Sequence, residues 1–283
     1  MHDADPNICS PEPLSSAEWH RVPLEETALR RAILSGSDLW SELTVVASTG
    51  STNEDLLTAA GAGAPPGSVL VAEEQTRGRG RLDRVWQSKP GAALTFSVLL
   101  RPAGVPPGNR GWLPLLAGVA VAAGLRVQAG LETSLKWPND VLAGQAKLAG
   151  ILAEQTGTAI VVGIGLNVGQ RHDELPSEQA TSVWLEGATG ADRAAILAAV
   201  LCEFEHWYQR WTSGPRPGDA TASGLRAEYL KYCATVGKQV RVELPGGSVL
   251  TGRATDVDGV GQLVVSTADG FHAVSAGDVV HVR

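Results

Sequence analysis

Short apolar runs and segments with helical spacing follow one another along the chain, and together they predict a set of strands and helices. Runs rich in Val, Ile and Leu, bounded by Gly, Pro or Ser, are typical of buried strands. The strands predicted in this way cover residues 43–49, 68–75, 93–100, the stretch SLKW at 134–137, 147–155 and 159–168. The predicted helices cover residues 25–35, 51–61, 113–125 and 192–211.

Three of these helices carry further signals. Ser51 is followed three residues later by Glu54, the spacing of a capping box, and the segment stops at Gly61. The apolar run 113–125 is too short to cross a bilayer and is predicted to be a buried helix. Apolar residues at three- and four-residue steps predict that 192–211 is an amphipathic helix packed on a sheet. These residues are Ile196, Leu197, Val200, Phe204, Trp207, Tyr208 and Trp211.

The strands outnumber the helices and do not alternate strictly with them, which favours an α+β fold over a doubly wound one. The character of the chain changes near Gly237, after which four or five short strands are separated by Gly-Gly, Asp-Gly and Gly-Asp pairs. This even spacing predicts a small β-barrel or sandwich. We therefore expect a leader with one short helix at 1–41, a main domain at 42–236 and a small β domain at 237–283.

Composition and charge are those of an ordinary soluble globular protein, with 43% hydrophobic and 19% charged residues. The formal net charge of -7 argues against non-specific binding to duplex DNA, which needs a broad basic face. Cys9, Cys202 and Cys233 form neither a disulfide framework nor a CxxC metal half-site, which favours a reducing compartment. Residues 1–16 lack the apolar core of a signal peptide. We expect a cytoplasmic protein with no membrane partner.

The stretch from Ala72 to Ser88 concentrates positive charge in a chain that is acidic as a whole. Its four arginines, set against Asp83, give a local charge near +3 (4 - 1), and its glycines let the backbone approach a ligand closely. Because like charges repel, we expect a mobile loop that closes on an anion; a solvated linker between two strands is the alternative. Trp86 favours the interpretation as a ligand-binding loop, since an exposed tryptophan usually has a partner. The arginines are Arg77, Arg79, Arg81 and Arg84.

The familiar phosphate-binding loops are missing from the sequence. No GxxxxGK[ST] string occurs. The segment GIGLNVG at 163–169 has the wrong glycine spacing for a dinucleotide fingerprint, and it ends a strand late in the domain. A Rossmann or P-loop enzyme is therefore not expected.

Three shorter segments hold further candidates, each with an ordinary structural alternative. In LKWPND, Pro138 forces a turn that leaves Lys136, Asn139 and Asp140 at a strand edge, although an ordinary turn explains Pro138, Asn139 and Asp140 equally well. Lys147 begins the strand KLAGIL, where a lysine is commonly a solvated charge. The triplet STN at 51–53 is equally a helix cap.

The order of these motifs is more specific than any one of them. STN, ExQTxGRGRxxRxW, KWPND, KLAGIL and GxGxNV follow one another within residues 43–283, and in this order the sequence resembles the biotin–protein ligases. The resemblance implies a mixed sheet like that of class II aminoacyl-tRNA synthetases, followed by a small SH3-like barrel. Two positions depart from the common pattern AGRGRxGRxW. Arg77 replaces an alanine and Asp83 a glycine, and Asp83 is a candidate partner for Arg81 or Arg84.

The resemblance implies an ATP-dependent ligase. Biotin and ATP would give biotinyl-5′-AMP and pyrophosphate, and biotin would then pass to one lysine of a biotin carboxyl carrier domain, with Mg²⁺ accompanying ATP. Only 42 residues precede Leu43, too few for the winged-helix DNA-binding domain that some members carry at the N-terminus. We therefore expect the type that does not bind DNA, as a monomer or a weak homodimer.

The resemblance also assigns residues to roles. For biotin it implies Ser51, Thr52, Asn53, Gln75, Gly78, Arg79, Gly80, Arg81, Lys147, Gly150 and Gly163. For ATP and the adenylate it implies Arg81, Arg84, Trp86, Asn139, Lys147 and Asn167. The catalytic candidates are Lys147, closest to the reacting oxygen, with Arg81 and Asp140. Asp140 would hold Mg²⁺ or orient the incoming lysine, and the sequence does not separate these roles.

Three other functions are less well supported. A lipoate or octanoyl transferase of the same fold group is disfavoured by the arginine-rich loop and KWPND. A biotin-responsive DNA-binding regulator is disfavoured by the acidic charge and the short leader. A catalytically inactive binding module is disfavoured because every charged position of the family pattern is filled.

Overall fold

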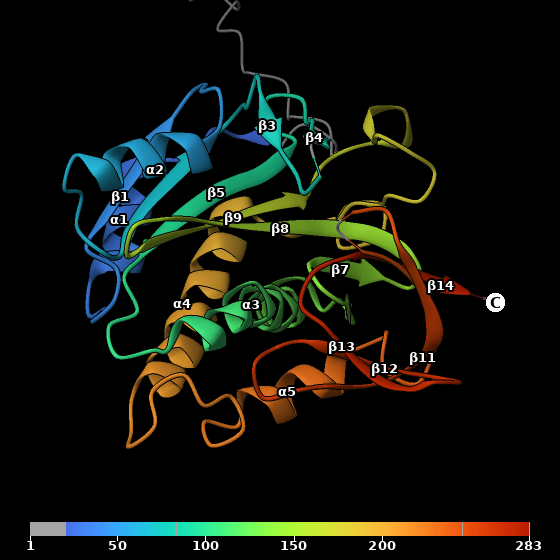
Figure 1. The fold of residues 1–283 in the computed structure, drawn as a ribbon. Coiled ribbons are helices and arrows are strands. Elements are labelled where there is room, and N and C mark those ends of the chain that lie inside the picture. Colours follow the sequence, from blue (N-terminus) through green and yellow to red (C-terminus); the bar gives the residue numbers. More distant parts are fainter. Residues whose placement is uncertain (1–20, 83, 245, 283) are drawn as a thin grey trace, which may run out of the picture.

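Two β-sheets organise the chain in a computed structural model that describes residues 21–82, 84–244 and 246–282 (Figure 1). The first half of the predicted leader, residues 1–20, lies outside the described residues. The expected pairing of Asp83 lies outside them as well.

The larger sheet has seven strands in the order β1-β2-β5-β9-β8-β7-β6. β1 and β2 run parallel and every other neighbouring pair is antiparallel, so the predicted mixed sheet of an α+β fold is confirmed. β2 and β5 are buried at every residue because both faces of the sheet are covered. The strands are β1 (Glu42–Val46), β2 (Ser68–Ala72), β5 (Ala93–Leu100), β6 (Ser134–Lys136), β7 (Asp140–Ala143), β8 (Ala146–Thr156) and β9 (Ala159–Asn167).

Helices lie on both sides of this sheet (Figure 1). α2 packs on β5 and β9 from one side, whereas α3 packs on β8 and β9 from the other, with α4 lying against α3. The leader helix α1 contacts β1 and α4, and α5 contacts α3. The helices are α1 (Glu26–Leu34), α2 (Thr52–Gly61), α3 (Trp112–Ala129), α4 (Arg193–Thr212) and α5 (Leu225–Tyr232), with 3₁₀ turns at Pro107–Gly111 and His172–Glu174.

The most apolar of these helices, α3, forms the centre of the core. Its buried residues run from Trp112 to Leu125, so the buried helix predicted for this segment is confirmed. With the turn before it, the helical segment Pro107–Ala129 is the one helix in the described part of the chain that could cross a membrane by length and composition alone. Its most apolar window is 67% buried inside the protein, as expected for a core helix. At Gly124, an added Cβ would lie 2.9 Å from the Val200 nitrogen, so α3 and α4 approach closely.

A second, fully antiparallel sheet follows, in the order β13-β12-β11-β10-β14. Its five strands confirm the small β unit predicted after Gly237. Val240 and Val242 are buried while their neighbours on β10 are exposed, the alternation of a strand with one face on a core. The strands are β10 (Gln239–Glu243), β11 (Val249–Val257), β12 (Leu263–Thr267), β13 (Gly270–Val274) and β14 (Asp278–Val282).

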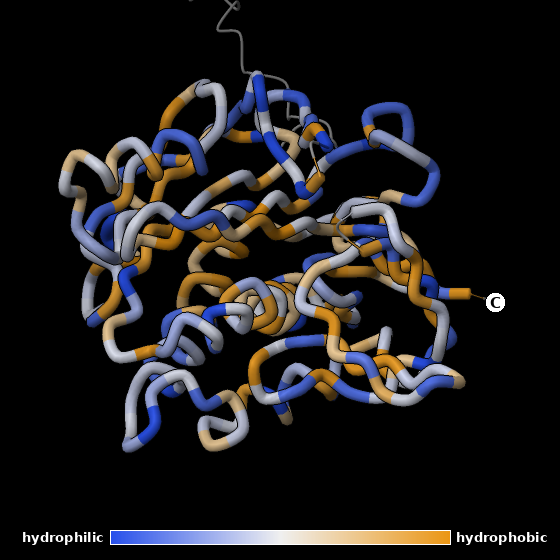
Figure 2. Tube along the Cα trace, in the orientation of Figure 1, coloured by the Kyte–Doolittle hydropathy of each residue, from blue (hydrophilic) through white to orange (hydrophobic). Residues whose placement is uncertain are grey.

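One hydrophobic core runs through both sheets. Buried side chains of the C-terminal sheet belong to the same cluster as those of α3 and α4, and Figure 2 shows apolar positions gathered along α3. Two indoles connect the sheets: Trp112 Nε1 donates to the Gly259 carbonyl (2.9 Å), and Trp137 Nε1 donates to the Gly261 carbonyl (3.0 Å). The C-terminal sheet is therefore fixed against the main domain.

One alternative interpretation and one local expectation are wrong. The arginine stretch is not a plain linker, because β3 (Gly78–Arg79) pairs with β4 (Val85–Trp86) to form a short antiparallel ribbon, the arginine hairpin. Ser51 precedes α2 but its side chain does not cap the helix. Instead, the Thr52 backbone N–H donates to Gln75 Oε1 at 2.8 Å. A side chain distant in sequence thus takes over the cap, which local spacing does not reveal.

Candidate functional site

A cavity of about 160 Å³ lies between the N-terminus of α2, the strands β8 and β9, and the arginine hairpin. Its wall is polar beside α2 and glycine-rich along β8 and β9. Most of the predicted site residues line it, although they come from six separate segments of the chain. These are Ser51, Thr52, Asn53, Gln75, Arg79, Gly80, Arg81, Arg84, Trp86, Asn139, Lys147, Gly150, Gly163 and Asn167.

Buried hydroxyl and amide groups form a chain of hydrogen bonds at the polar end of this cavity. Thr52 Oγ1 donates to Gln75 Oε1 at 3.0 Å and lies 2.7 Å from Ser97 Oγ. Ser97 Oγ in turn donates to Asn53 Oδ1 at 2.6 Å. Because Thr52, Asn53 and Ser97 are each less than 5% exposed, these contacts fix the orientation of both amides. The end of α2 therefore presents a rigid set of donors and acceptors.

Glu154 connects this network to the arginine hairpin. Its Oε2 accepts from Asn53 Nδ2 at 2.9 Å, and its Oε1 accepts from Arg79 Nη2. Asn53 Nδ2 also donates to the Leu152 carbonyl at 3.2 Å. One carboxylate therefore holds both the polar end of the cavity and the first strand of the hairpin.

Glycines on β8 and β9 make room for two side chains of the site. Gly163 and Gly165 lie on the same face of β9, since alternate strand residues share a face. A Cβ on Gly163 would overlap Asn53 Oδ1, and a Cβ on Gly165 would overlap the Trp86 indole. At Gly150 the added Cβ would lie 3.5 Å from the same indole. The space at Gly163, predicted for biotin, is therefore taken by Asn53, and Trp86 lies over the strand.

Every arginine of the hairpin region has a partner, so the predicted repulsion among them is offset. Arg77 Nη2 lies 3.9 Å from Glu54 Oε2, and Arg84 forms an ion pair with Asp278. Arg81 donates to Asn139 Oδ1 and to the Gly277 carbonyl, both at 3.1 Å. These partners come from α2, the turn before β7, β8 and the beginning of β14, far from the arginines in sequence. Counting only Asp83 against the arginines was therefore wrong.

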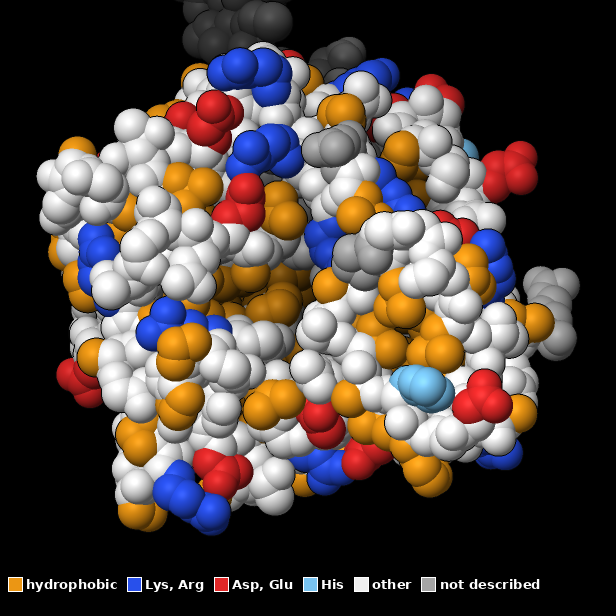
Figure 3. Space-filling model, viewed as in Figure 1, with side chains coloured by type: hydrophobic (Ala, Val, Ile, Leu, Met, Phe, Trp, Pro, Cys, Tyr) orange, Lys and Arg blue, Asp and Glu red, His pale blue; other side chains and the backbone are white. Residues whose placement is uncertain are grey.

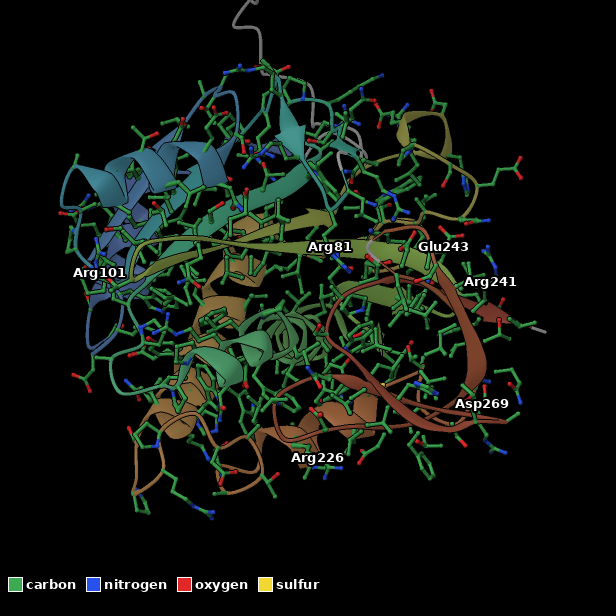
Figure 4. The ribbon with its side chains drawn as sticks, in the orientation of Figure 1. Arg81, Arg101, Arg226, Arg241, Glu243 and Asp269 are labelled. Carbon is green, nitrogen blue, oxygen red and sulfur yellow. The ribbon has the colours of Figure 1, made fainter. Side chains whose placement is uncertain are left out.

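The electrostatic settings of Arg81 and Arg84 differ. Burial lowers the pKa of the Arg81 guanidinium, although Asp278 and Asp140 act in the opposite direction. The hydrogen bond to Asp278 raises the pKa of the Arg84 guanidinium. Figure 4 shows Arg81 between the hairpin and the C-terminal sheet. Both guanidinium groups stay charged at neutral pH, so both offer positive charge to the cavity.

Lys147 and Asp140 form an ion pair at the other side of the cavity, with Nζ and Oδ1 2.6 Å apart. Lys147 is the second residue of β8 and pairs with Leu142 of β7, and Asp140 is the first residue of β7. Lys147 lines the cavity and is 37% exposed at its side chain, whereas Asp140 lies behind it. The ammonium group is therefore held in place and still open to a ligand.

The two asparagines predicted to contact nucleotide both hold backbone. Asn139 Nδ2 donates to the Ile151 carbonyl, and Asn167 Nδ2 donates to the Thr181 carbonyl, each at 2.9 Å. Asn167 Oδ1 accepts from Gln170 at 3.0 Å. Both side chains line the cavity, but their amides are engaged in shaping its wall.

A second cavity of about 270 Å³ adjoins the first at Arg81 and Asn139. It lies between β8, the start of α3 and the C-terminal sheet. Figure 3 shows this face of the molecule hollowed at its centre, with apolar side chains in the hollow. The main cavity thus continues toward the contact between the two sheets.

Known proteins are similar to this chain in sequence and in structure. Residues 45–170 match the biotin/lipoate A/B protein ligase family, and residues 235–282 match the biotin protein ligase C-terminal domain. A biotin–[acetyl-CoA-carboxylase] ligase of Mycobacterium tuberculosis is 44% identical over 268 residues, which cover 93% of this chain and 97% of that protein. The chain belongs to the biotin–protein ligase family.

Further relatives in this family agree with the fold. The bifunctional ligase/repressor BirA of Bacillus subtilis is 34% identical over 244 residues, covering 83% of this chain and 71% of that protein. The biotin protein ligase from Aquifex aeolicus in complex with biotin and ATP is similar in structure, with a TM-score of 0.72 and 30% identity. The match covers 86% of this chain and 100% of the Aquifex aeolicus chain. The mixed sheet followed by a small β unit is the fold of these ligases.

Two residues of the predicted site do not line the main cavity, and several lining residues were not predicted. Asp140 lies behind Lys147, and Gly78 faces Trp86, whose carbonyl would lie 2.5 Å from an added Cβ. The lining residues that were missed are Val85, Gln87, Phe96, Ile151, Leu152, Ile164, Gly165, Pro176 and Ala180. Ser97, which supports Asn53 from behind the lining, was missed as well. It had a signal in the sequence, since it and Thr95 are the two polar residues of the otherwise apolar strand β5.

No group of three or more His, Cys, Asp or Glu side chains in the described part of the chain could hold a metal ion. The carboxylates around the cavity face cations instead: Asp140 faces Lys147, and Glu154 faces Arg79. Mg²⁺ commonly binds through one or two carboxylates together with substrate phosphates. Asp140 fits that role as a single ligand to an ion brought by the nucleotide.

Proposed function

We propose that the chain is an ATP-dependent biotin–protein ligase, which joins biotin to ATP as biotinyl-5′-AMP and transfers biotin to a lysine of a biotin carboxyl carrier domain. The observation that carries the proposal is the meeting, in one cavity, of a rigid polar network, the cations of the arginine hairpin and the Lys147 ammonium. The relative named as a ligase of acetyl-CoA carboxylase and the neighbour bound to biotin and ATP support it.

The polar end of the cavity suits the ureido ring of biotin, a flat group with N–H donors and a carbonyl acceptor. We assign this ring to the end formed by Ser51, Thr52 and Gln75, with Asn53 and Glu154 fixing the wall. A buried site built from oriented donors and acceptors rejects analogues that leave those groups unpaired. Biotin would then extend its carboxylate toward Arg81 and Lys147.

Activation of biotin needs two anions to meet. A biotin carboxylate oxygen attacks the α-phosphorus of ATP, a P–O bond forms, and the bond to pyrophosphate breaks. Two unit charges 4 Å apart repel by about 4 kcal/mol at an effective dielectric constant of 20. We assign Arg81, Arg84 and Lys147 to offset this repulsion, because all three line the cavity and are held by partners before substrate arrives. Lys147 would lie closest to the reacting oxygen.

Trp86 and the two asparagines form the part of the wall that we assign to the nucleotide. Trp86 Nε1 is buried and has no hydrogen-bond partner among the described residues. Buried donors in native proteins are rarely left unpaired, so a ligand acceptor would complete it. Asn139 and Asn167 would border the nucleotide while holding the wall together.

In the second step, the carrier lysine attacks the acyl carbon as a free amine. A C–N bond forms, the C–O bond to AMP breaks, AMP leaves with the electron pair, and the amine proton passes to water. We assign Asp140, which pairs with Lys147, to orient the incoming lysine or, as the alternative, to hold Mg²⁺. Mg²⁺ brought by ATP would shield phosphate charge next to this carboxylate. These roles for Asp140 belong to the proposal, as does the division of the chain at residue 237.

Substrate choice tests this function against a lipoate or octanoyl transferase. The purified protein is incubated with ATP, a biotin carrier domain or a lipoyl domain, and either isotope-labelled biotin or lipoate. We expect mass gain only with biotin and the biotin carrier domain. Transfer of lipoate to the lipoyl domain, without biotin transfer, would reject the proposal.

A further inference from the structure

The first residue of β14, Asp278, and the residue before it, Gly277, hold the arginine hairpin from the side of the C-terminal sheet. The Gly277 carbonyl accepts from Arg81 Nη2 at 3.1 Å. The Asp278 carboxylate accepts from both Nη atoms of Arg84, with Nη1 and Oδ1 3.3 Å apart. Two adjacent residues at the beginning of β14 therefore bind the two arginines that we assign to the phosphates.

The position of this carboxylate is set by the sheet rather than by a loop. Asp278 pairs with Glu243 in the ladder between β14 and β10. A Cβ on the preceding Gly277 would lie 2.7 Å from Val242 Cγ1 and 3.0 Å from the Glu243 carbonyl. Only glycine allows β14 to begin this close to β10, so the backbone beneath Asp278 has little freedom to move.

Charge makes the contact between Asp278 and Arg84 mutually favourable. Burial alone would raise the pKa of the Asp278 carboxyl, but the hydrogen bond and charge of Arg84, with Lys136 and Arg81, hold it below its ordinary value. The carboxylate is thus ionised at neutral pH. Arg84 is 60% exposed at its side chain. Since a guanidinium has five N–H donors, Arg84 keeps donors free for a phosphate while it is bound to Asp278.

We propose that Asp278 is a positioning residue for the adenylation step, which holds Arg84 over the cavity so that the guanidinium meets the ATP phosphates without first being ordered. The inference rests on the proposed function. It gives the C-terminal sheet a part in nucleotide binding although no residue of that sheet lines the main cavity. Preorganised side chains bind more tightly because less conformational freedom is lost on binding.

The test measures KM for ATP and for biotin in pyrophosphate release by Asp278→Asn. We expect KM for ATP to rise about fivefold, the size of effect of one well-placed ion pair, with KM for biotin within about twofold of wild type. Asp278→Glu, which keeps the charge, should recover at least half of the loss. If Asp278→Asn does not fold, KM for ATP and KM for biotin are measured in Asp278→Ser instead and compared with wild type in the same way.

Two matched controls separate positioning from general effects of charge and stability. Glu243→Gln removes the same charge from the register partner of Asp278, which binds Arg241 and makes no hydrogen bond to Arg84 in the described residues. Asp256→Asn removes another ion pair of the C-terminal sheet, with Arg226, which Figure 4 shows well away from Arg81. Both should leave KM for ATP unchanged.

Three results would overturn the inference. The first is an unchanged KM for ATP in Asp278→Asn. The second is a lower KM for ATP, since Asp278 would then compete with phosphate for Arg84. The third is an equal rise in both KM values, matched by Asp256→Asn, which would indicate a purely structural role. A wild-type protein without biotin-dependent pyrophosphate release would instead reject the proposed function itself.

Discussion

Each cation around the cavity is held by a partner from elsewhere in the chain. Lys147 is held by Asp140, Arg79 by Glu154 and Arg84 by Asp278. Such pairs contribute little to stability where they are exposed, but they restrict where a long flexible side chain points. At the scale of single residues, the site is a set of charges fixed in place before any anion arrives.

Replacement of Lys147 by alanine removes the ammonium group that we place nearest the reacting oxygen. We expect biotin-dependent pyrophosphate release to fall by about 10²–10³-fold, the usual loss when one group that stabilises transition-state charge is removed, while biotin affinity changes little. Stopped-time assays of pyrophosphate and calorimetry with biotin measure the two effects. Lys136→Ala is the control, because Lys136 opposes Asp140 in the β6–β7 ladder but does not line the main cavity. Near-normal adenylate formation by Lys147→Ala would remove Lys147 from this role.

Replacement of Arg81 by glycine removes the side chain that joins the hairpin to both Asn139 and the C-terminal sheet. We expect activated biotin to escape, because the cavity is then less well closed over it. Biotin labelling of an unrelated lysine-rich protein, added in excess, measures the escape. Arg77→Gly is the control. It should label the lysine-rich protein no more than wild type does, since Arg77 contacts Glu54 and does not line the main cavity. Equal labelling by Arg81→Gly and wild type contradicts the expectation.

At the scale of elements, the site depends on close contact between the arginine hairpin and β9. The Trp86 indole lies over Gly165, where no side chain could stand without moving it. The same strand accommodates Asn53 at Gly163. Two glycines on one face of β9 therefore bring α2 and the hairpin to the same cavity.

Gly165→Ala should displace Trp86 and disturb the nucleotide part of the wall. We expect KM for ATP to rise severalfold and the free energy of unfolding to fall by about 1–3 kcal/mol, the usual cost of overpacking. Gly61→Ala is the control, since an added Cβ there meets nothing within 4 Å. Steady-state kinetics and urea unfolding measure both quantities. A Gly165→Ala protein with unchanged KM for ATP would show that the position of Trp86 does not matter for the nucleotide.

Local patterns in the sequence predict the elements well and their contacts poorly. The buried helix α3 and the strands β8 and β9 were predicted within a few residues, because apolar periodicity is a local signal. Glu154, Ser97 and Asp278 were missed, since each acquires its role from a partner at least 44 residues away in sequence. The motifs indicated which residues meet at the site, whereas the acidic residues that hold the arginines could be identified only from the folded structure.

At the scale of the whole molecule, the C-terminal sheet and the main domain share one core. Trp112 and Trp137 donate their indole N–H groups to carbonyls of the turn between β11 and β12. Trp137 directly precedes Pro138 and Asn139, so the contact between the sheets also fixes the KWPND turn beside the site. Loss of that contact should lower the free energy of unfolding and also disturb the shape of the cavity.

Trp137→Phe removes one such bond and leaves the Gly261 carbonyl without its donor. We expect the free energy of unfolding to fall by about 1–3 kcal/mol, the cost of an unsatisfied buried polar group. Urea unfolding monitored by circular dichroism measures it. Trp207→Phe should cost less, because Trp207 keeps 9% of its surface exposed whereas Trp137 is only 1% exposed. Equal losses in the two variants would argue that the bond to Gly261 contributes nothing beyond packing.

The central claim is that one cavity brings a biotin carboxylate and the α-phosphate of ATP together among fixed cations. Exchange of labelled pyrophosphate into ATP tests it most directly, because the exchange reports reversible adenylate formation without any carrier protein. We predict exchange that depends on biotin, saturates with both substrates and is nearly lost in Lys147→Ala. A folded wild-type protein that binds ATP and biotin, yet catalyses no biotin-dependent exchange, would contradict the account.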